Sequence, residues 1–265
     1  MSLDIVIPIY NESKILEKSI IHIHKKIKKI IPNKRFNFIL VENGSTDESL
    51  RQIYRLKKKF KNISVYRRKK SNYGASLKQG CIKAKNDFIL IMNIDHLWDD
   101  HFFKWSWKYR INFDVIIGSK RSDPFLNKQS KYRKILSGLL NFILSFFLNS
   151  VFADTHGMKM INRKKTLKQI KLCQLSRGQF DTELMLRLAR NQYKIAEIPI
   201  PYIEKRNPRN FMLRKILIFV PFLLVIVACG GGGGTTTTSP NISTESTGTG
   251  SGYQVPGSFQ PVDSE

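Results

Sequence analysis

Three polar clusters in the first hundred residues each follow a short apolar run, and each contains side chains able to bind a ligand. They are Tyr10-Asn11-Glu12, Glu42-Asn43-Gly44 and Asn93-Ile94-Asp95. Carboxylate and amide oxygens accept hydrogen bonds and bind divalent cations. In open parallel sheets, ligands bind beyond the carboxyl ends of the strands. The three clusters therefore predict one binding site along a single edge of a sheet.

Two further acidic residues lie much later in the chain, in the segment Phe180-Asp181-Thr182-Glu183-Leu184. Either Asp181 or Glu183 is a candidate general base toward a hydroxyl group. The alternative is that both occupy the first turn of a helix, where the helix dipole stabilises negative charge. The sequence leaves these two interpretations open.

The elements that position these residues are predicted by apolar periodicity. Buried strands are expected at 3–9, 36–41, 63–66, 87–92 and 113–117. A helix is expected after Ser13, its predicted cap, because apolar residues recur at helical spacing from Ile15 to Ile30. A second helix is expected at 74–84. Residues Glu42 to Asp47 are expected to form a turn followed by a helix start, with Asp47 as a candidate cap of that helix. The alternation predicts an α/β fold with a mostly parallel central sheet and helices on both faces.

The net charge of +25 belongs to the first part of the chain, because residues 212–265 contain two basic and three acidic residues. A nucleic-acid surface, a surface for anionic lipid and a compositional bias toward Lys, Ile and Asn each explain such a charge. Because no nucleic-acid-binding motif accompanies the lysines, we predict no nucleic-acid partner. The cysteines Cys81, Cys173 and Cys229 form no CxxC pair. Their separation argues against a disulfide framework or a zinc site and fits a reduced, cytoplasmic setting.

Two apolar segments bear on membrane association. Residues 135–153 carry no charge and have a polar residue every fourth position from Ser137 to Asn149, which fits a buried helix or one lying in a membrane interface. Residues 212–229 resemble a lipoprotein signal or a hydrophobic anchor, so that Met212 is a plausible start of a second reading frame. We predict three parts: a domain at 1–211, the hydrophobic segment at 212–229, and a low-complexity, disordered tail at 230–265.

Seven segments, in order along the chain, resemble the motifs of family 2 glycosyltransferases. They are Asp4 to Glu12 (DIVIPIYNE), Val41 to Asp47 (VENGSTD), Asn72 to Gly80 (NYGASLKQG), Met92 to Asp95 (MNID), Gly118 to Arg121 (GSKR), Asp154 to Lys159 (DTHGMK) and Glu197 to Arg206. The last two are similar to segments of the polyprenyl-phosphate sugar synthases, the dolichol-phosphate mannose synthase type. The resemblance covers about residues 1–210 and implies the Rossmann-like GT-A nucleotide-diphospho-sugar transferase fold.

The resemblance also implies roles for individual residues. It places the nucleotide sugar against Pro8, Tyr10, Glu12, Glu42, Asn43, Asn72, Gly74 and Asn93. Asp95 would hold Mg²⁺ or Mn²⁺ against the diphosphate, and Arg121 and Arg206 would meet donor or acceptor phosphate. Two departures stand out: Glu42-Asn43 replaces the usual Asp pair, and Asn93 replaces the first Asp of the DxD motif. The second change removes a negative charge beside the metal.

The resemblance predicts transfer of a single sugar from a nucleotide-diphosphate sugar to polyprenyl phosphate, at the cytoplasmic face of the membrane, by a peripheral or C-terminally anchored enzyme. One alternative acceptor is a saccharide or lipid-linked glycan hydroxyl, for which Asp181 or Glu183 would be the base. Another alternative, suggested by Asn93, is a non-catalytic nucleotide-sugar-binding relative. No QxxRW sequence is present, which disfavours a processive polysaccharide synthase, and no pattern indicates an oligomeric state.

Overall fold

The computed structural model describes residues 1–95, 99–119, 127–128, 155–200, 202–203 and 253–254. The chain divides into two units, Met1–Tyr202 with Ser251–Glu265 and Ile203–Gly250. The described residues belong to the first unit, apart from Ile203. The uncharged 135–153 segment, the hydrophobic 212–229 segment and the predicted boundary at 211 lie outside the described residues. Among the described helices, none is long and apolar enough to cross a membrane.

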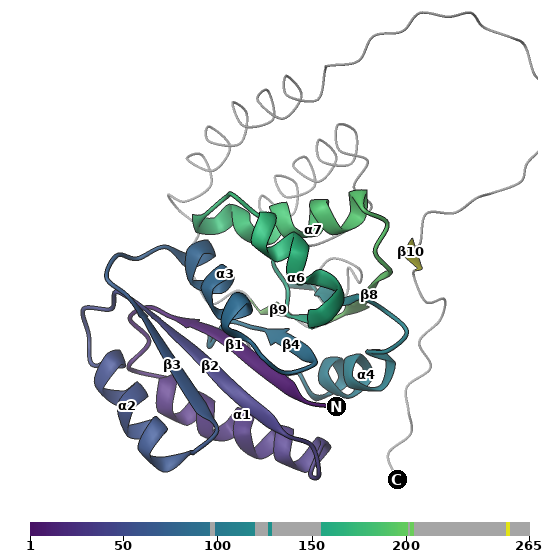
Figure 1. Cartoon of the computed structure of the whole chain (residues 1–265). Coiled ribbons are helices and arrows are strands. Elements are labelled where there is room, and N and C mark those ends of the chain that lie inside the picture. The colour runs from purple at the N-terminus through teal and green to yellow at the C-terminus, as the bar shows by residue number, and fades with distance from the viewer. Residues whose placement is uncertain (96–98, 120–126, 129–154, 201, 204–252, 255–265) are drawn as a thin grey trace, which may run out of the picture. The chain divides into compact units, whose positions relative to one another are not determined.

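Strands and helices alternate through the first half of the chain, as predicted (Figure 1). The strands are β1 (Leu3–Ile9), β2 (Phe36–Asn43), β3 (Ile63–Arg68), β4 (Phe88–Ile91), β5 (Val115–Ser119), β6 (Asn127–Lys128), β7 (Lys159–Asn162), β8 (Ile195–Pro199), β9 (Tyr202–Ile203) and β10 (Tyr253–Gln254). The helices are α1 (Leu16–Ile30), α2 (Ser49–Lys59), α3 (Tyr73–Lys83), α4 (Asp100–Tyr109), α6 (Arg163–Leu172), the 3₁₀ turn η1 (Arg177–Gln179) and α7 (Phe180–Arg190).

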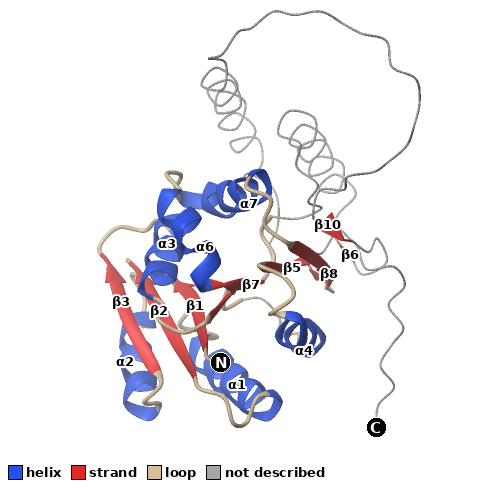
Figure 2. Ribbon diagram, turned by 45° about the vertical axis from the view of Figure 1, so that its right-hand side comes forward, coloured by secondary structure: helices blue, strands red, loops and turns tan. Residues whose placement is uncertain are grey.

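Strands β6 and β9 form a separate two-stranded sheet, and the other eight described strands form one sheet in the order β10-β8-β5-β7-β4-β1-β2-β3. All neighbours are parallel except β7, which runs antiparallel to both β4 and β5. The carboxyl ends of β1, β2 and β4 therefore meet at one edge, where the three polar clusters were predicted to gather. Figure 2 shows the sheet between two groups of helices, with α3, α6 and α7 on one side and α1, α2 and α4 on the other. The predicted α/β class and mostly parallel sheet are confirmed.

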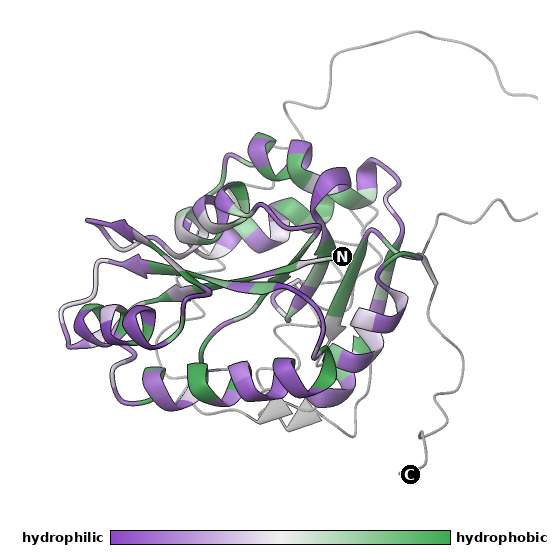
Figure 3. Cartoon of the chain, turned by 60° about the horizontal axis from the view of Figure 1, so that its bottom comes forward, coloured by the Kyte–Doolittle hydropathy of each residue, from purple (hydrophilic) through white to green (hydrophobic). Residues whose placement is uncertain are grey.

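Alternating side chains of the strands supply two apolar cores, one on each face of the sheet. Ile5 and Ile7 of β1 pack in the cluster that includes residues of α1, α2 and α4. Val6, between them, packs in the cluster that includes residues of α3, α6 and α7. Figure 3 shows mainly hydrophobic strands in the sheet and helices that carry both hydrophobic and hydrophilic residues. Burial of each such aliphatic side chain stabilises the fold by about 1.5–3 kcal/mol.

Helix α1 begins without the predicted cap. Its N-cap position is Ile15, which makes no side-chain capping bond, whereas Ser13 donates its backbone N–H to Asp47 Oδ2 at 3.0 Å. The predicted capping role of Ser13 is therefore wrong, because the turn after β1 is held by the turn after β2. The carbonyl of Glu12 instead accepts from the N–H groups of Ile15 and Leu16, at 3.0 and 2.9 Å. The helix is stabilised by burial of its apolar face and by basic residues in its last turn.

The fifth strand begins two residues later than predicted. Asp114 precedes β5 and is 7% exposed. Its carboxylate binds Lys165 Nζ at 2.6 Å and the backbone N–H of Lys194 at 2.9 Å. These bonds fix the entry to the strand, so that its ladder begins at Val115 and extends to Ser119.

Candidate active site

The turns that follow β1 and β2 are bound to each other by polar side chains. Asn11 has a φ of 54° and accepts from the backbone N–H of Thr46 at 2.8 Å, while its own N–H donates to Ser45 Oγ at 3.1 Å. The backbone N–H of Glu12 donates to Ser49 Oγ at 2.9 Å. An Asn tolerates the left-handed conformation better than most residues. The turns after β1 and β2 thus form one hydrogen-bonded structure.

Asp47 closes this structure with both of its carboxylate oxygens. Its two carboxylate oxygens accept from the backbone N–H groups of Ser13 and Ser49, at 3.0 and 2.9 Å. Partial burial raises the pKa of Asp47, but hydrogen bonds from Ser49 and Ser13 outweigh that effect and lower it to about 2. Asp47 is therefore ionised wherever the protein is near neutral pH, and its charge is used to hold the two turns together.

Glu42 and Asn43, at the end of β2, are both buried. Glu42 is 1% exposed and forms an ion pair with Arg67, between Oε2 and Nε at 3.3 Å. Asn43 Oδ1 accepts from the backbone N–H of Asn72 at 2.7 Å and from Ser76 Oγ at 2.8 Å. Asn43 therefore binds the start of α3 to the end of β2. A contact of either residue with a base or ribose stays a prediction.

Asn72 and Gly74 connect α3 to η1. Asn72 is the N-cap of α3: its Oδ1 accepts from the N–H of Ala75 at 3.1 Å and from the N–H of Arg177 at 2.7 Å. A Cβ added at Gly74 would lie 2.5 Å from the Arg177 carbonyl oxygen. The structure thus gives both residues an internal role, since they let η1 approach α3, and the predicted approach of donor to this glycine remains a prediction. Arg177 itself has a φ of 59°.

The third polar cluster follows β4. Asn93 and Asp95 are half-buried at the strand end, where the resemblance placed them. The Tyr73 hydroxyl donates to Asn93 Oδ1 at 3.0 Å. Burial, followed by the charge of Asp181, raises the pKa of Tyr73 well above its usual value, so its phenol keeps its proton. Tyr73 was not among the residues predicted from the sequence.

Asp181 forms a buried ion pair that links α7 to β7. Its Oδ1 lies 2.7 Å from Lys159 Nζ, and both side chains are 1% exposed. Lys159 also donates to the Gly157 carbonyl at 2.9 Å. The segment before β7 is bound to α7 a second time, because Thr155 Oγ1 lies 3.1 Å from Thr182 Oγ1. A lysine inside the apolar run Met158-Lys159-Met160-Ile161 is the sequence signal for such a partner, since buried charges are normally paired.

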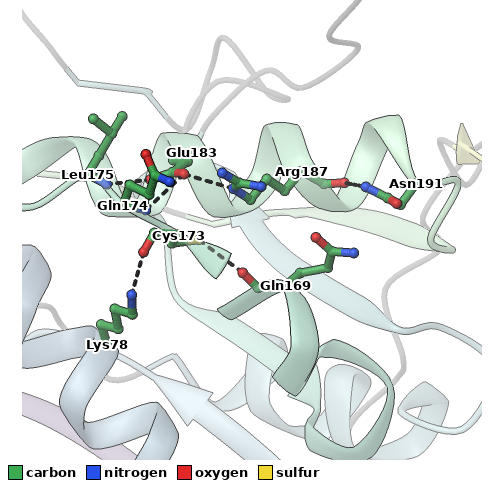
Figure 4. A network of polar contacts seen from close by, with 8 residues as sticks. All are labelled: Lys78, Gln169, Cys173, Gln174, Leu175, Glu183, Arg187 and Asn191. Carbon is green, nitrogen blue, oxygen red and sulfur yellow. Dashed lines mark hydrogen bonds and ion pairs between the residues drawn. The ribbon is translucent and has the colours of Figure 1, made fainter. Parts of the chain in front are cut away.

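Glu183 has a different environment, shown in Figure 4. One carboxylate oxygen accepts from the N–H groups of Gln174 and Leu175, at 2.9 and 2.6 Å, and the other lies 2.8 Å from Arg187 Nε. These bonds fix the loop between α6 and α7. Although Asp181 and Glu183 are two residues apart, the structure directs them to different partners. Asp181 pairs with Lys159 of β7, and Glu183 binds the loop before α7.

The remaining predicted residues fall into two groups. Pro8 is buried within β1 and Tyr10 is 47% exposed just after it, with Glu12 half-buried two residues further on. They lie at the same strand-end edge as Glu42, Asn43, Asn93 and Asp95. Arg121 and Arg206 lie outside the described residues, and their predicted contacts with phosphate remain predictions.

The residues at this edge fit a divalent cation that takes most of its ligands from the bound substrate. Among the described residues, no three His, Cys, Asp or Glu side chains gather into a metal-binding group. Mg²⁺ is commonly bound by one or two carboxylates together with substrate phosphates rather than by an all-protein cage. A single carboxylate at the strand end, Asp95, with the amide of Asn93 two residues earlier, is compatible with that arrangement.

A mostly parallel sheet with an antiparallel strand beside its centre, and a carboxylate after β4, is the architecture of GT-A glycosyltransferases. The chain belongs to glycosyl transferase family 2, whose model matches residues 4–171. The expected fold is supported by glucosyl-3-phosphoglycerate synthase of Mycobacterium tuberculosis, with a TM-score of 0.62 at 15% identity over 84% of this chain and 80% of that one. Mannosyltransferase PcManGT from Pyrobaculum calidifontis, solved with GDP-Man and Mn²⁺, has a TM-score of 0.61 at 14% identity over 88% of this chain and 65% of that one.

Two curated relatives are similar over most of the chain. Glycosyltransferase AglD of Haloferax volcanii is 23% identical over 221 residues, which are 82% of this chain and 35% of AglD. Dolichyl-phosphate beta-glucosyltransferase ALG5C of Trichomonas vaginalis is 24% identical over 219 residues, which are 75% of this chain and 63% of that protein. The chain thus spans less than two thirds of the length of either relative.

Proposed function

We propose that the chain transfers one sugar from a nucleotide-diphosphate sugar to polyprenyl phosphate at the cytoplasmic face of a membrane. The observation that carries this proposal is that both candidate bases are engaged within the protein. Glu183 is bound by two backbone N–H groups and Arg187, and Asp181 is buried against Lys159. A hydroxyl acceptor needs a base, whereas a phosphate monoester has a second pKa of about 6 and is already largely ionised at neutral pH.

Two further observations support a lipid phosphate. The relative from Trichomonas vaginalis is named for transfer to dolichyl phosphate. The strong positive charge before residue 212 suits an anionic membrane surface and a phosphate nucleophile. The proposed catalytic domain is 1–211, with 212–229 as a hydrophobic segment and 230–265 as a tail. If residues 212–229 enter the membrane, the enzyme is C-terminally anchored. If they do not, the enzyme is peripheral.

The roles of residues follow from their places at the strand-end edge. Asp95 would hold Mg²⁺ or Mn²⁺, which compensates the charge of the diphosphate leaving group. The nucleoside would lie against the turns after β1 and β2, with Pro8, Tyr10 and Glu42 nearest to it. Asn72 and Gly74 would keep the start of α3 close to the donor. Arg121 and Arg206 would position the acceptor phosphate.

Transfer to a glycan hydroxyl is the second candidate function. Asp181 Oδ2 is buried and has no hydrogen-bond partner among the described residues, so this oxygen has capacity to accept a proton. The two candidates differ in the acceptor they need and in their dependence on Asp181, Glu183 and Arg206.

An acceptor assay separates them. Membranes or detergent-solubilised polyprenyl phosphate would be compared with free glycans, using a panel of nucleotide sugars and Mn²⁺. We expect transfer to the lipid phosphate, loss of about tenfold to a hundredfold in Arg206→Ala, and retained transfer in Glu183→Gln. Transfer to glycans alone, or loss with Glu183→Gln alongside indifference to Arg206→Ala, would overturn the proposal. Binding of nucleotide sugar without any transfer would indicate the non-catalytic relative.

A further inference from the structure

Tyr73 connects two parts of the site that no sequence motif joins. As the first residue of α3, it reaches the end of β4 by the 3.0 Å bond between its hydroxyl and Asn93 Oδ1. The start of α3 packs against the start of α7, since a Cβ added at Gly74 would lie 2.7 Å from Cβ of Phe180, and the charge of the neighbouring Asp181 contributes to the raised pKa of the phenol. Asp181 is in turn paired with Lys159 on β7. The hydroxyl therefore lies between the donor edge and the buried ion pair.

This cluster contains one unsatisfied atom. Asp181 Oδ1 accepts from Lys159, but Asp181 Oδ2 has no hydrogen-bond partner among the described residues, although Asp181 is 1% exposed. A buried carboxylate oxygen without a donor is unfavourable, and such atoms are rare in folded proteins. The nearby phenol has one proton, which in the observed geometry goes to Asn93.

Rotation of the Asn93 amide would allow both the Tyr73 hydroxyl and Asp181 Oδ2 to be hydrogen-bonded. The oxygen and nitrogen of an amide side chain occupy nearly equivalent positions, and the hydrogen-bond network decides between them. Turning the amide by half a rotation places Nδ2 beside the phenol oxygen. The amide then donates to Tyr73, and the phenol proton is available to Asp181 Oδ2.

We propose that Asn93, Tyr73 and Asp181 form a hydrogen-bonded relay, in which Tyr73 accepts from the Asn93 amide and donates to the Asp181 carboxylate. Tyr73 is thereby a positioning residue for the strand-end amide next to Asp95. An aspartate at position 93 is an acceptor only, so it would compete with Asp181 for the single phenol proton. The asparagine that departs from the usual DxD pattern is therefore matched to Tyr73, rather than being a mark of lost activity.

The inference rests on the proposed function in one respect, that the strand-end edge binds a nucleotide diphosphate. A double-mutant cycle of Tyr73→Phe and Asn93→Asp tests it, read as affinity for UDP and for GDP with Mn²⁺ by calorimetry, and as the unfolding equilibrium in urea. Tyr54→Phe is the control, because Tyr54 on α2 is 48% exposed. We expect each single change to weaken nucleotide binding by about tenfold, in the range seen when a residue supporting a metal site is removed.

The diagnostic result is the dependence of Asn93→Asp on Tyr73. With phenylalanine at 73 there is no phenol proton to compete for, so we expect Asn93→Asp to be at least about threefold less harmful there. Additive effects of the two changes would overturn the relay. If the wild-type chain binds neither nucleotide, the proposed function fails, and the relay is judged by the unfolding equilibrium alone. The same coupling is expected in that measurement, and additivity there would equally overturn it.

Discussion

Asp47 shows how one carboxylate sets the geometry of two turns. Its pKa of about 2 lies below the ordinary value of 3.8, so the folded state favours the ionised form. The stabilisation is present above pH 3.8 and is lost as the pH falls toward 2. We expect Asp47→Asn to lower the free energy of unfolding by about 1 kcal/mol at pH 7, as for other capping side chains. The difference from wild type in urea unfolding should shrink between pH 4 and pH 2. A difference that is constant with pH would show that the charge is not what holds the turns.

Asp95 is the residue on which the proposed metal site depends. Replacing it by alanine removes the carboxylate that would hold the cation against the diphosphate. We expect Asp95→Ala to lower transfer on the order of a hundredfold or more while leaving unfolding by urea unchanged. Mn²⁺-dependent nucleotide binding, measured by calorimetry, should fall in parallel. The control is Glu48→Ala, whose side chain is 65% exposed. Full activity of Asp95→Ala, or full activity in excess chelator, would disprove the metal role.

Individual site residues were predictable where both partners follow adjacent parallel strands, and not where a partner lies on a helix whose docking the sequence does not specify. Asn11 and Asp47 bind residues 35 and 34 positions away, but the parallel pairing of β1 and β2 brings those two turns together. The partner of Lys159 lies 22 residues away on another element, and the contact of Tyr73 with Asn93 lies 20 residues away. Such pairs depend on how helices dock, which periodicity does not specify.

Helix α3 is held close to the sheet by its glycines. A Cβ at Gly80 would lie 2.4 Å from Val6 Cγ1 and 3.2 Å from Val41 Cγ2. We expect Gly80→Ala to destabilise the protein by about 1–3 kcal/mol, because overpacking outweighs the gain in helix propensity. Gly178→Ala is the matched control, since a Cβ there would meet nothing within 4 Å, and its effect should stay within about 0.5 kcal/mol. Equal unfolding midpoints in the two variants would contradict the close approach of α3.

At the scale of elements, the first half of the sheet is well predicted by apolar runs, and the second half is not. The prediction for β1 agrees with its observed bounds, Leu3–Ile9. Strand β7 has four residues and runs against its neighbours. A strand this short has too few alternations to be recognised, and its direction depends on the route of the chain rather than on its own side chains. The positions of helices α6 and α7 likewise depend on the route of the chain and not on their own side chains.

At the scale of the whole molecule, the buried apolar residues that the structure describes lie between Leu3 and Ile200. The described contact with the sheet from the far end of the chain is β10, two residues paired with β8. Because the low-complexity tail at 230–265 cannot bury a core of its own, we expect a chain truncated after residue 211 to fold, with cooperative urea unfolding and the circular dichroism of an α/β protein. Loss of cooperative unfolding would show that residues after 211 pack against the domain.

The antiparallel course of β7 has a consequence for how such a domain can diversify. Ile117 of β5 pairs with Lys159 of β7, so the chain leaves and re-enters the sheet at adjacent points of one edge. The register of β5 and β7 is set by their own pairing, so insertions or deletions in the sequence between Ser119 and Lys159 can change its length without shifting either strand.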